Sequence, residues 1–160
     1  MRSWVIPAGG VVVVVVGIAL AVAGSTFDHR FETDGERIYF TGRNEKGQRI
    51  AYEGGATSGL MMAGGLSCAS CHGGNAEGGR RRMHMLVMDA PDIRWATLVA
   101  EAEDGHGHGE SGTYDLATFR QAVVVGEHPG GEPLNDLMPR WQLNDRDLAA
   151  LAEYLQSLEK

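Results

Sequence analysis

Two cysteines three positions apart, with a histidine directly after the second, constrain this chain more than any other feature. The segment reads Cys68-Ala69-Ser70-Cys71-His72, and the chain has no other cysteine. Covalent attachment of haem needs this pattern, because each thiol adds to one vinyl group of the porphyrin and the adjacent histidine is placed to bind the iron. The motif therefore predicts one covalent haem c, with Cys68 and Cys71 as thioether donors and His72 as an iron ligand.

Three other uses of a Cys-x-x-Cys pair remain open but account for less of the sequence. A structural zinc site needs two further cysteine or histidine ligands at metal-binding spacing, and no further cysteine exists. A thioredoxin-like redox pair would leave His72 without a role and lacks the expected βαβ context. A disulfide between Cys68 and Cys71 would close a very small loop and contribute little stability.

The N-terminal region is apolar. Trp4 to Gly24 contains no charged residue and is long enough, at about 21 residues, to cross a bilayer as a helix. Arg2 precedes it and Asp28 follows it, which places the N-terminus in the cytoplasm. We therefore predict a transmembrane anchor over residues 1–25, a linker over 26–33 and a haem domain over 34–160.

A cleaved signal peptide is the competing interpretation of the same region. Ala21-Val22-Ala23 is an acceptable cleavage site, and the apolar stretch after Gly10 has the length of a signal-peptide core. Both interpretations export the haem domain, so a location outside the bacterial cytoplasm is expected in either case.

The charge balance excludes some classes of partner. Without Arg2 the chain carries 13 Lys and Arg against 21 Asp and Glu, a net charge of −8. Such a chain is poorly suited to bind nucleic acid or an anionic bilayer surface. The 23 glycines indicate a small, loop-rich domain.

Four segments have the apolar spacing and the capping residues of α-helices. They are residues 33–41, 93–102, 114–125 and 145–158. Thr33 and Asn144 are suited to cap helix N-termini, and Gly42 and Gly126 are suited to end helices. Inward-facing side chains are expected at Ile38, Tyr39, Trp95, Leu98 and Val99, and along a stripe of Leu148, Leu151, Leu155 and Leu158 bordered by Tyr154.

A second iron ligand is expected from methionine. Met138 precedes Pro139, which disfavours a helical backbone at Met138 and holds its thioether on an extended loop. The other candidates, with weaker spacing arguments, are Met61, Met62, Met83, Met85 and Met88.

Two charged segments have alternative interpretations. Arg80-Arg81-Arg82 is expected to be a solvated loop, with a docking patch or a partner for a haem propionate as the alternative. His106 and His108, flanked by carboxylates, could hold a metal, although an exposed loop is the simpler interpretation.

The attachment motif, the Met-Pro loop and the terminal amphipathic helix, in this order, resemble the class I c-type cytochromes over roughly residues 33–158. The resemblance implies an all-α cytochrome c fold of three to five helices around one haem, in addition to the transmembrane helix. It implies His72 as the proximal and Met138 as the distal iron ligand, and a Pro91 carbonyl that accepts the Nδ1–H of His72. It also implies a crossed pair of terminal helices, where Gly35 permits close approach and where Tyr39 and Tyr154 pack.

The run from Phe119 to Trp141 is similar to cytochromes that accompany bacterial respiratory complexes. Within it, Arg140 and Trp141 are candidates to contact the haem edge or a propionate. We expect single-electron transfer between a quinol-oxidising complex and a terminal oxidase, or as a subunit of one, at the periplasmic side of the inner membrane. The alternatives are a cytochrome subunit of a periplasmic dehydrogenase, for example one acting on sulfur compounds, and a haem-based gas sensor. An iron with two protein ligands has no open position for a substrate, so the chain is not expected to be an enzyme by itself.

Overall fold

The computed structural model describes residues 31–55, 65–83, 86–104 and 113–158. Its helices are α1 (Asp34–Thr41), α2 (Cys68–His72), α3 (Trp95–Asp104), α4 (Leu116–Arg120) and α5 (Asp145–Ser157), with a π-helical turn η1 (Gln121–Val125) directly after α4. Its strands are β1 (Tyr52–Glu53), β2 (Gly79–Met83), β3 (Leu86–Ala90) and β4 (Arg140–Trp141). All of these elements belong to one compact unit, Phe31–Lys160.

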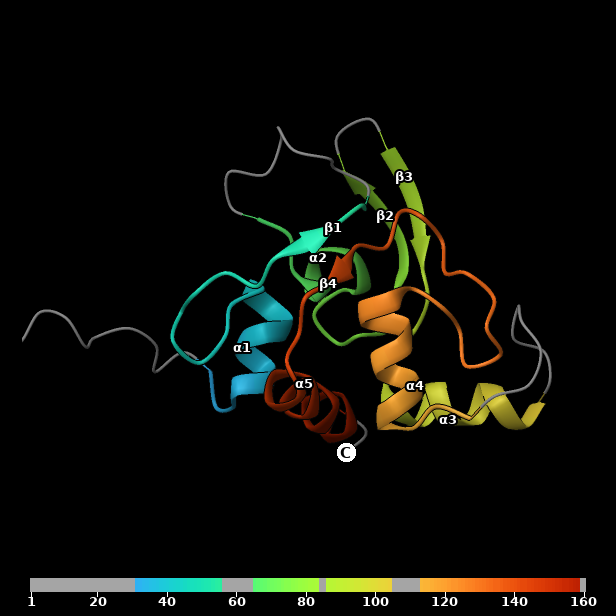
Figure 1. Ribbon diagram of the computed structural model, residues 1–160. Helices are drawn as coiled ribbons and strands as arrows, with labels where there is room; N and C mark the ends of the chain where they lie inside the picture. Colours follow the sequence, from blue (N-terminus) through green and yellow to red (C-terminus); the bar gives the residue numbers. More distant parts are fainter. Residues whose placement is uncertain (1–30, 56–64, 84–85, 105–112, 159–160) are drawn as a thin grey trace, which may run out of the picture. The chain divides into compact units, whose positions relative to one another are not determined.

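The first and last helices, α1 and α5, lie side by side (Figure 1). A Cβ atom at Gly35 would stand 1.9 Å from the Ala150 carbonyl oxygen, so only glycine permits this approach. Tyr39 and Tyr154 pack beside the crossing, with ring centroids 5.2 Å apart. The close helix contact and the tyrosine packing are therefore present as expected.

The ends of both helices follow from their capping residues. The Thr33 hydroxyl accepts a hydrogen bond from the Glu36 N–H at 3.0 Å, and Gly42 ends α1 with a φ of +61°. The Asn144 side chain accepts from the Asp147 N–H at 2.9 Å at the start of α5. The predicted caps of these two helices are confirmed.

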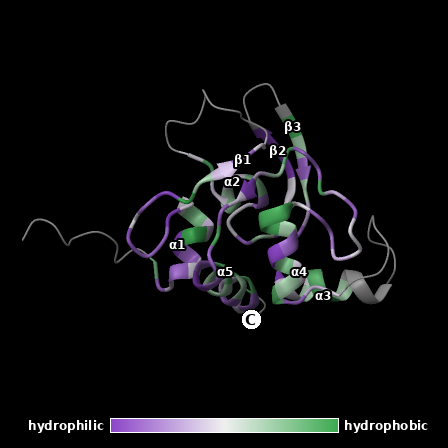
Figure 2. Cartoon of the chain, viewed as in Figure 1, coloured by the Kyte–Doolittle hydropathy of each residue, from purple (hydrophilic) through white to green (hydrophobic). Residues whose placement is uncertain are grey.

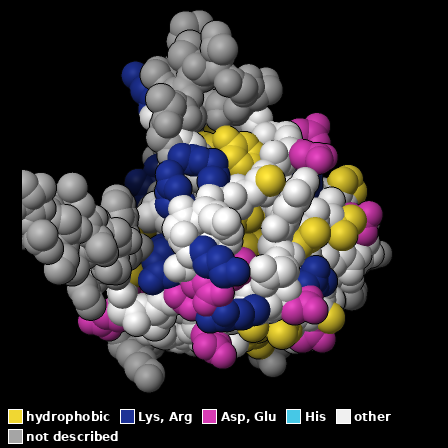
Figure 3. Space-filling model, turned by 60° about the vertical axis from the view of Figure 1, so that its left-hand side comes forward, with side chains coloured by type: hydrophobic (Ala, Val, Ile, Leu, Met, Phe, Trp, Pro, Cys, Tyr) yellow, Lys and Arg dark blue, Asp and Glu magenta, His cyan; other side chains and the backbone are white. Residues whose placement is uncertain are grey.

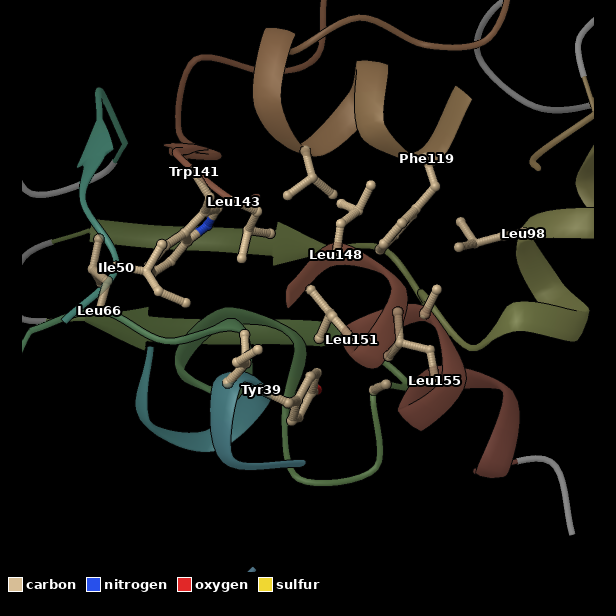
Figure 4. Packing of buried hydrophobic residues seen from close by; sticks show 14 residues of the cluster. Tyr39, Ile50, Leu66, Leu98, Phe119, Trp141, Leu143, Leu148, Leu151 and Leu155 are labelled. Atoms are coloured by element: carbon tan, nitrogen blue, oxygen red, sulfur yellow. The ribbon is translucent and has the colours of Figure 1, made fainter. Parts of the chain in front are cut away.

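The core is formed by residues of all the larger helices. Ile38 and Tyr39 of α1 are buried, as are Leu148, Leu151 and Leu155 of α5. Figure 4 shows Leu98 of α3 and Phe119 of α4 pointing into the space beside the α5 leucines. The apolar spacing therefore predicted the inward faces of these helices correctly.

The segment predicted as one helix over residues 114–125 is divided between α4 and η1. Asp115 begins it with a capping box, in which Asp115 and Thr118 each accept a hydrogen bond from the other's backbone N–H at 2.8 Å. Gly126 ends it with a φ of +92°. The predicted end is thus correct, while the wider π-helical turn before it is not visible in a helix-period pattern.

The arginine run forms a strand, which corrects the expectation of a loop. β2 and β3 pair antiparallel, with Arg81 opposite Met88. Figure 2 shows a hydrophilic β2 beside a β3 that begins hydrophobic. The five α-helices agree with the predicted helical fold, and the described residues add two small sheets that were not predicted, β1 with β4 and β2 with β3.

Several predicted features lie outside the described residues. These are the anchor over 1–25, most of the linker over 26–33, and Met61, Met62, Met85, His106 and His108, together with the side chain of Met83. Across residues 31–158, as far as they are described, no helix is long and apolar enough to cross a membrane.

Candidate functional site

The described residues form a cavity of about 490 Å³. This volume is typical of cofactor sites, which range from roughly 300 to 1,000 Å³. α2, β3, η1, α5 and the loop before β4 all contribute to its walls. Cys68, Cys71, His72, Met138 and Trp141 line it, and most of its other lining residues are apolar.

The short helix α2 carries both cysteines and the histidine. The backbone N–H of Ser67 donates to Ser70 Oγ at 3.2 Å, and the two hydroxyls lie 3.0 Å apart, which fixes the first turn. Both cysteines are half-buried at the cavity wall, and no disulfide joins them. Before haem is attached, burial raises the pKa of Cys68 to about 12 and also raises the pKa of Cys71, which favours the neutral thiols.

The imidazole of His72 has a fixed orientation. It is 5 % exposed, and its Nδ1 lies 2.9 Å from the Pro91 carbonyl oxygen. Because a carbonyl can only accept, Nδ1 carries the proton and the Nε2 lone pair is left for a metal. Burial also lowers the pKa of His72, which favours the neutral form that binds iron.

Gly78 allows the Pro91 carbonyl to reach His72. A Cβ atom at Gly78 would stand 2.4 Å from the Pro91 carbonyl oxygen, and the φ of +67° is in the left-handed region. The Gly78 N–H also donates to the His72 carbonyl at 2.9 Å. The backbone therefore holds His72 at two points, its carbonyl and its ring.

Met138 lies on a loop that its own hydrogen bonds define. The Leu137 N–H donates to Asn135 Oδ1 at 2.9 Å, and the Met138 N–H donates to the Asn135 carbonyl at 3.0 Å. The thioether is half-buried and packs against the core at the cavity wall. Met88, 8 % exposed on β3, also lines this cavity, so the described residues place two methionines on its wall.

The neighbours of Met138 have different surroundings. Trp141 is buried, lines the cavity and packs against Tyr52 at a centroid distance of 4.9 Å. Arg140 is not among the cavity-lining residues, and its guanidinium bonds to the carbonyls of Met138 and Leu134. The suggested contact of Arg140 with a propionate stays a prediction.

Arg81 lies next to the attachment motif. Gly73 directly follows His72, and a Cβ atom at Gly73 would stand 2.0 Å from Arg81 Nη2. The same Nη2 donates to the Gly78 carbonyl at 3.1 Å. Its Nε is buried without a hydrogen-bond partner. The positive charge lowers the pKa of both Cys71 and His72, although burial dominates the shifts of both groups.

Sequence reasoning missed some of the cavity wall. His128 and Leu134 line the cavity from the loop after Gly126. The glycines and prolines of that loop indicated turns, but no local signal shows that turns distant from the motif close the same space. In the part of the chain that the structure describes, no group of three His, Cys, Asp or Glu residues is placed to hold a metal ion.

The donor set fits a covalently attached haem. Two thiols and an imidazole with a free Nε2 meet at one largely apolar cavity, with a thioether on the same wall. Residues 44–159 match the family model described as Cytochrome c. No curated protein and no solved structure matches the chain.

Proposed function

Because this chain belongs to the cytochrome c family and carries covalent haem c, we propose that it transfers single electrons in a bacterial respiratory chain. Electron transfer is the activity that family membership supports. The proposal adds the context: transfer between a quinol-oxidising complex and a terminal oxidase, or as a subunit of one. The similarity of residues 119–141 to cytochromes of respiratory complexes supports this context.

The bound haem supplies one-electron iron chemistry. Cys68 and Cys71 would hold the porphyrin, His72 Nε2 would bind the iron, and the thioether of Met138 would supply a second iron ligand. A His/Met pair favours ferrous iron and raises the reduction potential, which suits a carrier late in a respiratory chain. The observation that carries the proposal is the hydrogen bond from His72 Nδ1 to Pro91, since it leaves Nε2 free on a cavity that Met138 also lines.

The two methionines of the cavity provide the test. We expect Met138→Ala to abolish the methionine–iron absorbance band of the oxidised protein, to lower the reduction potential and to let the reduced protein bind CO. Met88→Leu removes the second methionine that lines the cavity among the described residues, and it should leave all three properties unchanged. Loss of the band in Met88→Leu with its retention in Met138→Ala would overturn the ligand assignment.

Two alternative functions are separated by further measurements. A gas sensor would bind CO readily in the wild-type reduced form, because its sixth ligand must leave. A subunit of a periplasmic dehydrogenase would co-purify with a catalytic subunit after mild detergent extraction, whereas the proposed role predicts subunits of a quinol-oxidising complex or an oxidase.

We also propose that the haem domain is held at the periplasmic face of the inner membrane. The uncharged stretch from Trp4 to Gly24 and the position of Arg2 before it support this location. Covalent haem attachment itself requires export from the bacterial cytoplasm, which agrees with that orientation.

A further inference from the structure

The side chain of Arg140 connects three points of the segment that presents Met138. Its Nη1 donates to the Met138 carbonyl, and its Nη2 donates to the Leu134 carbonyl at 3.1 Å. The third point is Gly126, where a Cβ atom would stand 1.6 Å from Arg140 Nε and 2.4 Å from its Cδ. The guanidinium therefore occupies the space that any other residue at position 126 would fill.

Two of these points, Gly126 and Leu134, are the ends of one loop. The Gly126 N–H donates to the Gln121 carbonyl at 2.8 Å, which ties the start of the loop to η1. The Leu134 N–H donates to the Gly126 carbonyl at 2.7 Å, which closes the loop on itself. Arg140 itself is fixed by β4, where it pairs with Glu53 of β1. A side chain anchored in a sheet thus spans the base of the loop and ends at Met138.

We propose that Arg140 is a positioning residue that holds the Met138 thioether in reach of the iron. This inference rests on the proposed function, in which Met138 is the sixth ligand. The guanidinium acts on the carbonyl of Met138 and on the turn before it, not on the haem. When these two hydrogen bonds are removed, the loop gains freedom, and an external ligand displaces Met138 more easily.

Only arginine offers this geometry. Its planar group presents five donors in a fixed fork, so it can donate to two separate carbonyls while its flat face packs against Gly126. A lysine ammonium at the same position keeps the charge but cannot donate to the carbonyls of both Met138 and Leu134 in one fixed orientation. Hydrogen bonds from a charged donor are also stronger than neutral ones, so their loss should change ligand binding measurably.

The test uses imidazole as an external ligand of the oxidised, haem-loaded protein. We expect Arg140→Gln to bind imidazole at least about tenfold more tightly than the wild type, in line with the loss of a charge-assisted hydrogen bond. Arg140→Lys should bind imidazole with an affinity between those of the wild type and Arg140→Gln. The methionine–iron band of both variants should weaken. The matched control is Arg43→Gln, which removes an arginine that also donates to a loop carbonyl, that of Gly47 at 2.6 Å, and should leave both readouts unchanged.

A double-mutant cycle with Gly126→Ala separates positioning from folding. The strain of a φ of +92° is present in both backgrounds and cancels, whereas the clash with Cδ and Nε exists only where Arg140 is present, because Arg140→Ala removes both atoms. Gly126→Ala should therefore tighten imidazole binding more in the wild type than in Arg140→Ala. Circular dichroism and covalent haem staining report whether each variant folds and is loaded.

The outcomes distinguish the two proposals. If Met138→Ala keeps the methionine–iron band, the ligand assignment of the proposed function fails. A second outcome is that Met138→Ala loses the band, but Arg140→Gln, folded and loaded with haem, binds imidazole as tightly as the wild type does. In that case only the inference about Arg140 is overturned. Additive effects of Gly126→Ala and Arg140→Ala on imidazole binding would overturn it as well.

Discussion

The side chains of the site are oriented largely by backbone groups. The ring of His72 is held by the Pro91 carbonyl, and the carbonyl of His72 accepts from the Gly78 N–H. A missing Cβ at Gly78 is what lets these groups meet. Orientation of an iron-binding imidazole by its second nitrogen also fixes its tautomer, so this contact governs both the position and the donor strength of the ligand.

The attachment residues give the first prediction. Cys68→Ala or Cys71→Ala removes one thiol and should leave at most one thioether to the haem. The double variant should hold none, since the chain has no third cysteine. Haem staining of a denaturing gel measures this directly, because only covalently bound haem stays with the chain. Staining of the double variant would contradict covalent attachment at this motif.

Arg81 gives a second prediction at this scale. Its charge lies beside Gly73, next to His72, and a positive charge near an iron centre disfavours the more positive ferric state. Arg81→Gln should therefore lower the reduction potential, measured by potentiometric titration. The matched controls are Arg80→Gln and Arg82→Gln, whose side chains are exposed on the same strand and screened by solvent. Equal shifts in all three variants would contradict a specific effect of Arg81.

At the scale of elements, the sequence predicts what local signals determine. The caps at Thr33 and Asn144 and the leucine spacing in α5 identify the terminal helices, because helix ends and apolar faces depend on nearby residues. The β2–β3 hairpin was missed because Arg80 to Arg82 do not alternate between polar and apolar side chains. The spacing of the motif was enough to predict Cys68, Cys71 and His72 as haem-binding residues.

The remaining contacts of the site are not local. The contact between His72 and Pro91 came only from a family resemblance, since 19 positions separate the two residues. The contacts of Arg140 with Gly126 and Leu134 depend on how a loop folds back on its own base. No periodicity in the sequence reports such a contact, so these contacts of Arg140 could not be predicted from the sequence, and its contact with a propionate stays a prediction.

The crossing of α1 and α5 gives the prediction at this scale. Gly35→Ala places a methyl group against the backbone of Ala150, which cannot move without separating the helices. We expect a loss of about 1–3 kcal/mol in the free energy of unfolding, as is usual for overpacking, despite the better helix propensity of alanine. Thermal unfolding followed by circular dichroism measures it. Gly74→Ala is the control, since a Cβ there meets no atom within 4 Å.

At the scale of the whole chain, we expect two features to determine how the haem domain meets a partner: the N-terminal region and the charge distribution. On the face in Figure 3, basic side chains lie among acidic ones. Arg146 pairs with Asp34 and Glu45, and Arg37 also pairs with Asp34, so two positive and two negative charges balance in this group. The net charge of −8 outside Arg2 is therefore what a distant partner experiences.

The N-terminal region gives a prediction about confinement. If residues 1–25 remain as an anchor, intact-mass analysis of the membrane fraction should return the mass of the full chain with its haem. The linker over 26–33 can extend only to about 30 Å, so the domain would stay close to the bilayer. A mature protein that begins near Gly24 would instead be a diffusible periplasmic carrier, and the proposed anchor would be wrong.

Steering of the encounter is the last prediction, and two features oppose each other in it. The net negative charge attracts a partner with a basic docking surface, whereas Arg80 and Arg82 are exposed on β2, close in sequence to the motif. Electrostatic interactions between exposed charges fade beyond the Debye length, about 8 Å at physiological salt. The net charge should therefore govern the approach, and the two arginines should affect only the final orientation.

The second-order rate of electron transfer to the natural acceptor, measured against ionic strength, tests this view. For a freely diffusing haem domain the rate should fall as salt rises, because salt screens an attraction between opposite charges. The double variant of Arg80→Gln and Arg82→Gln should change the rate modestly at every salt concentration. A rate that climbs with salt would mean that the acceptor is also acidic, which contradicts steering by the net charge. A flat profile would mean that the complex is already assembled, so that the anchor replaces diffusion as the means by which the haem domain and its acceptor meet.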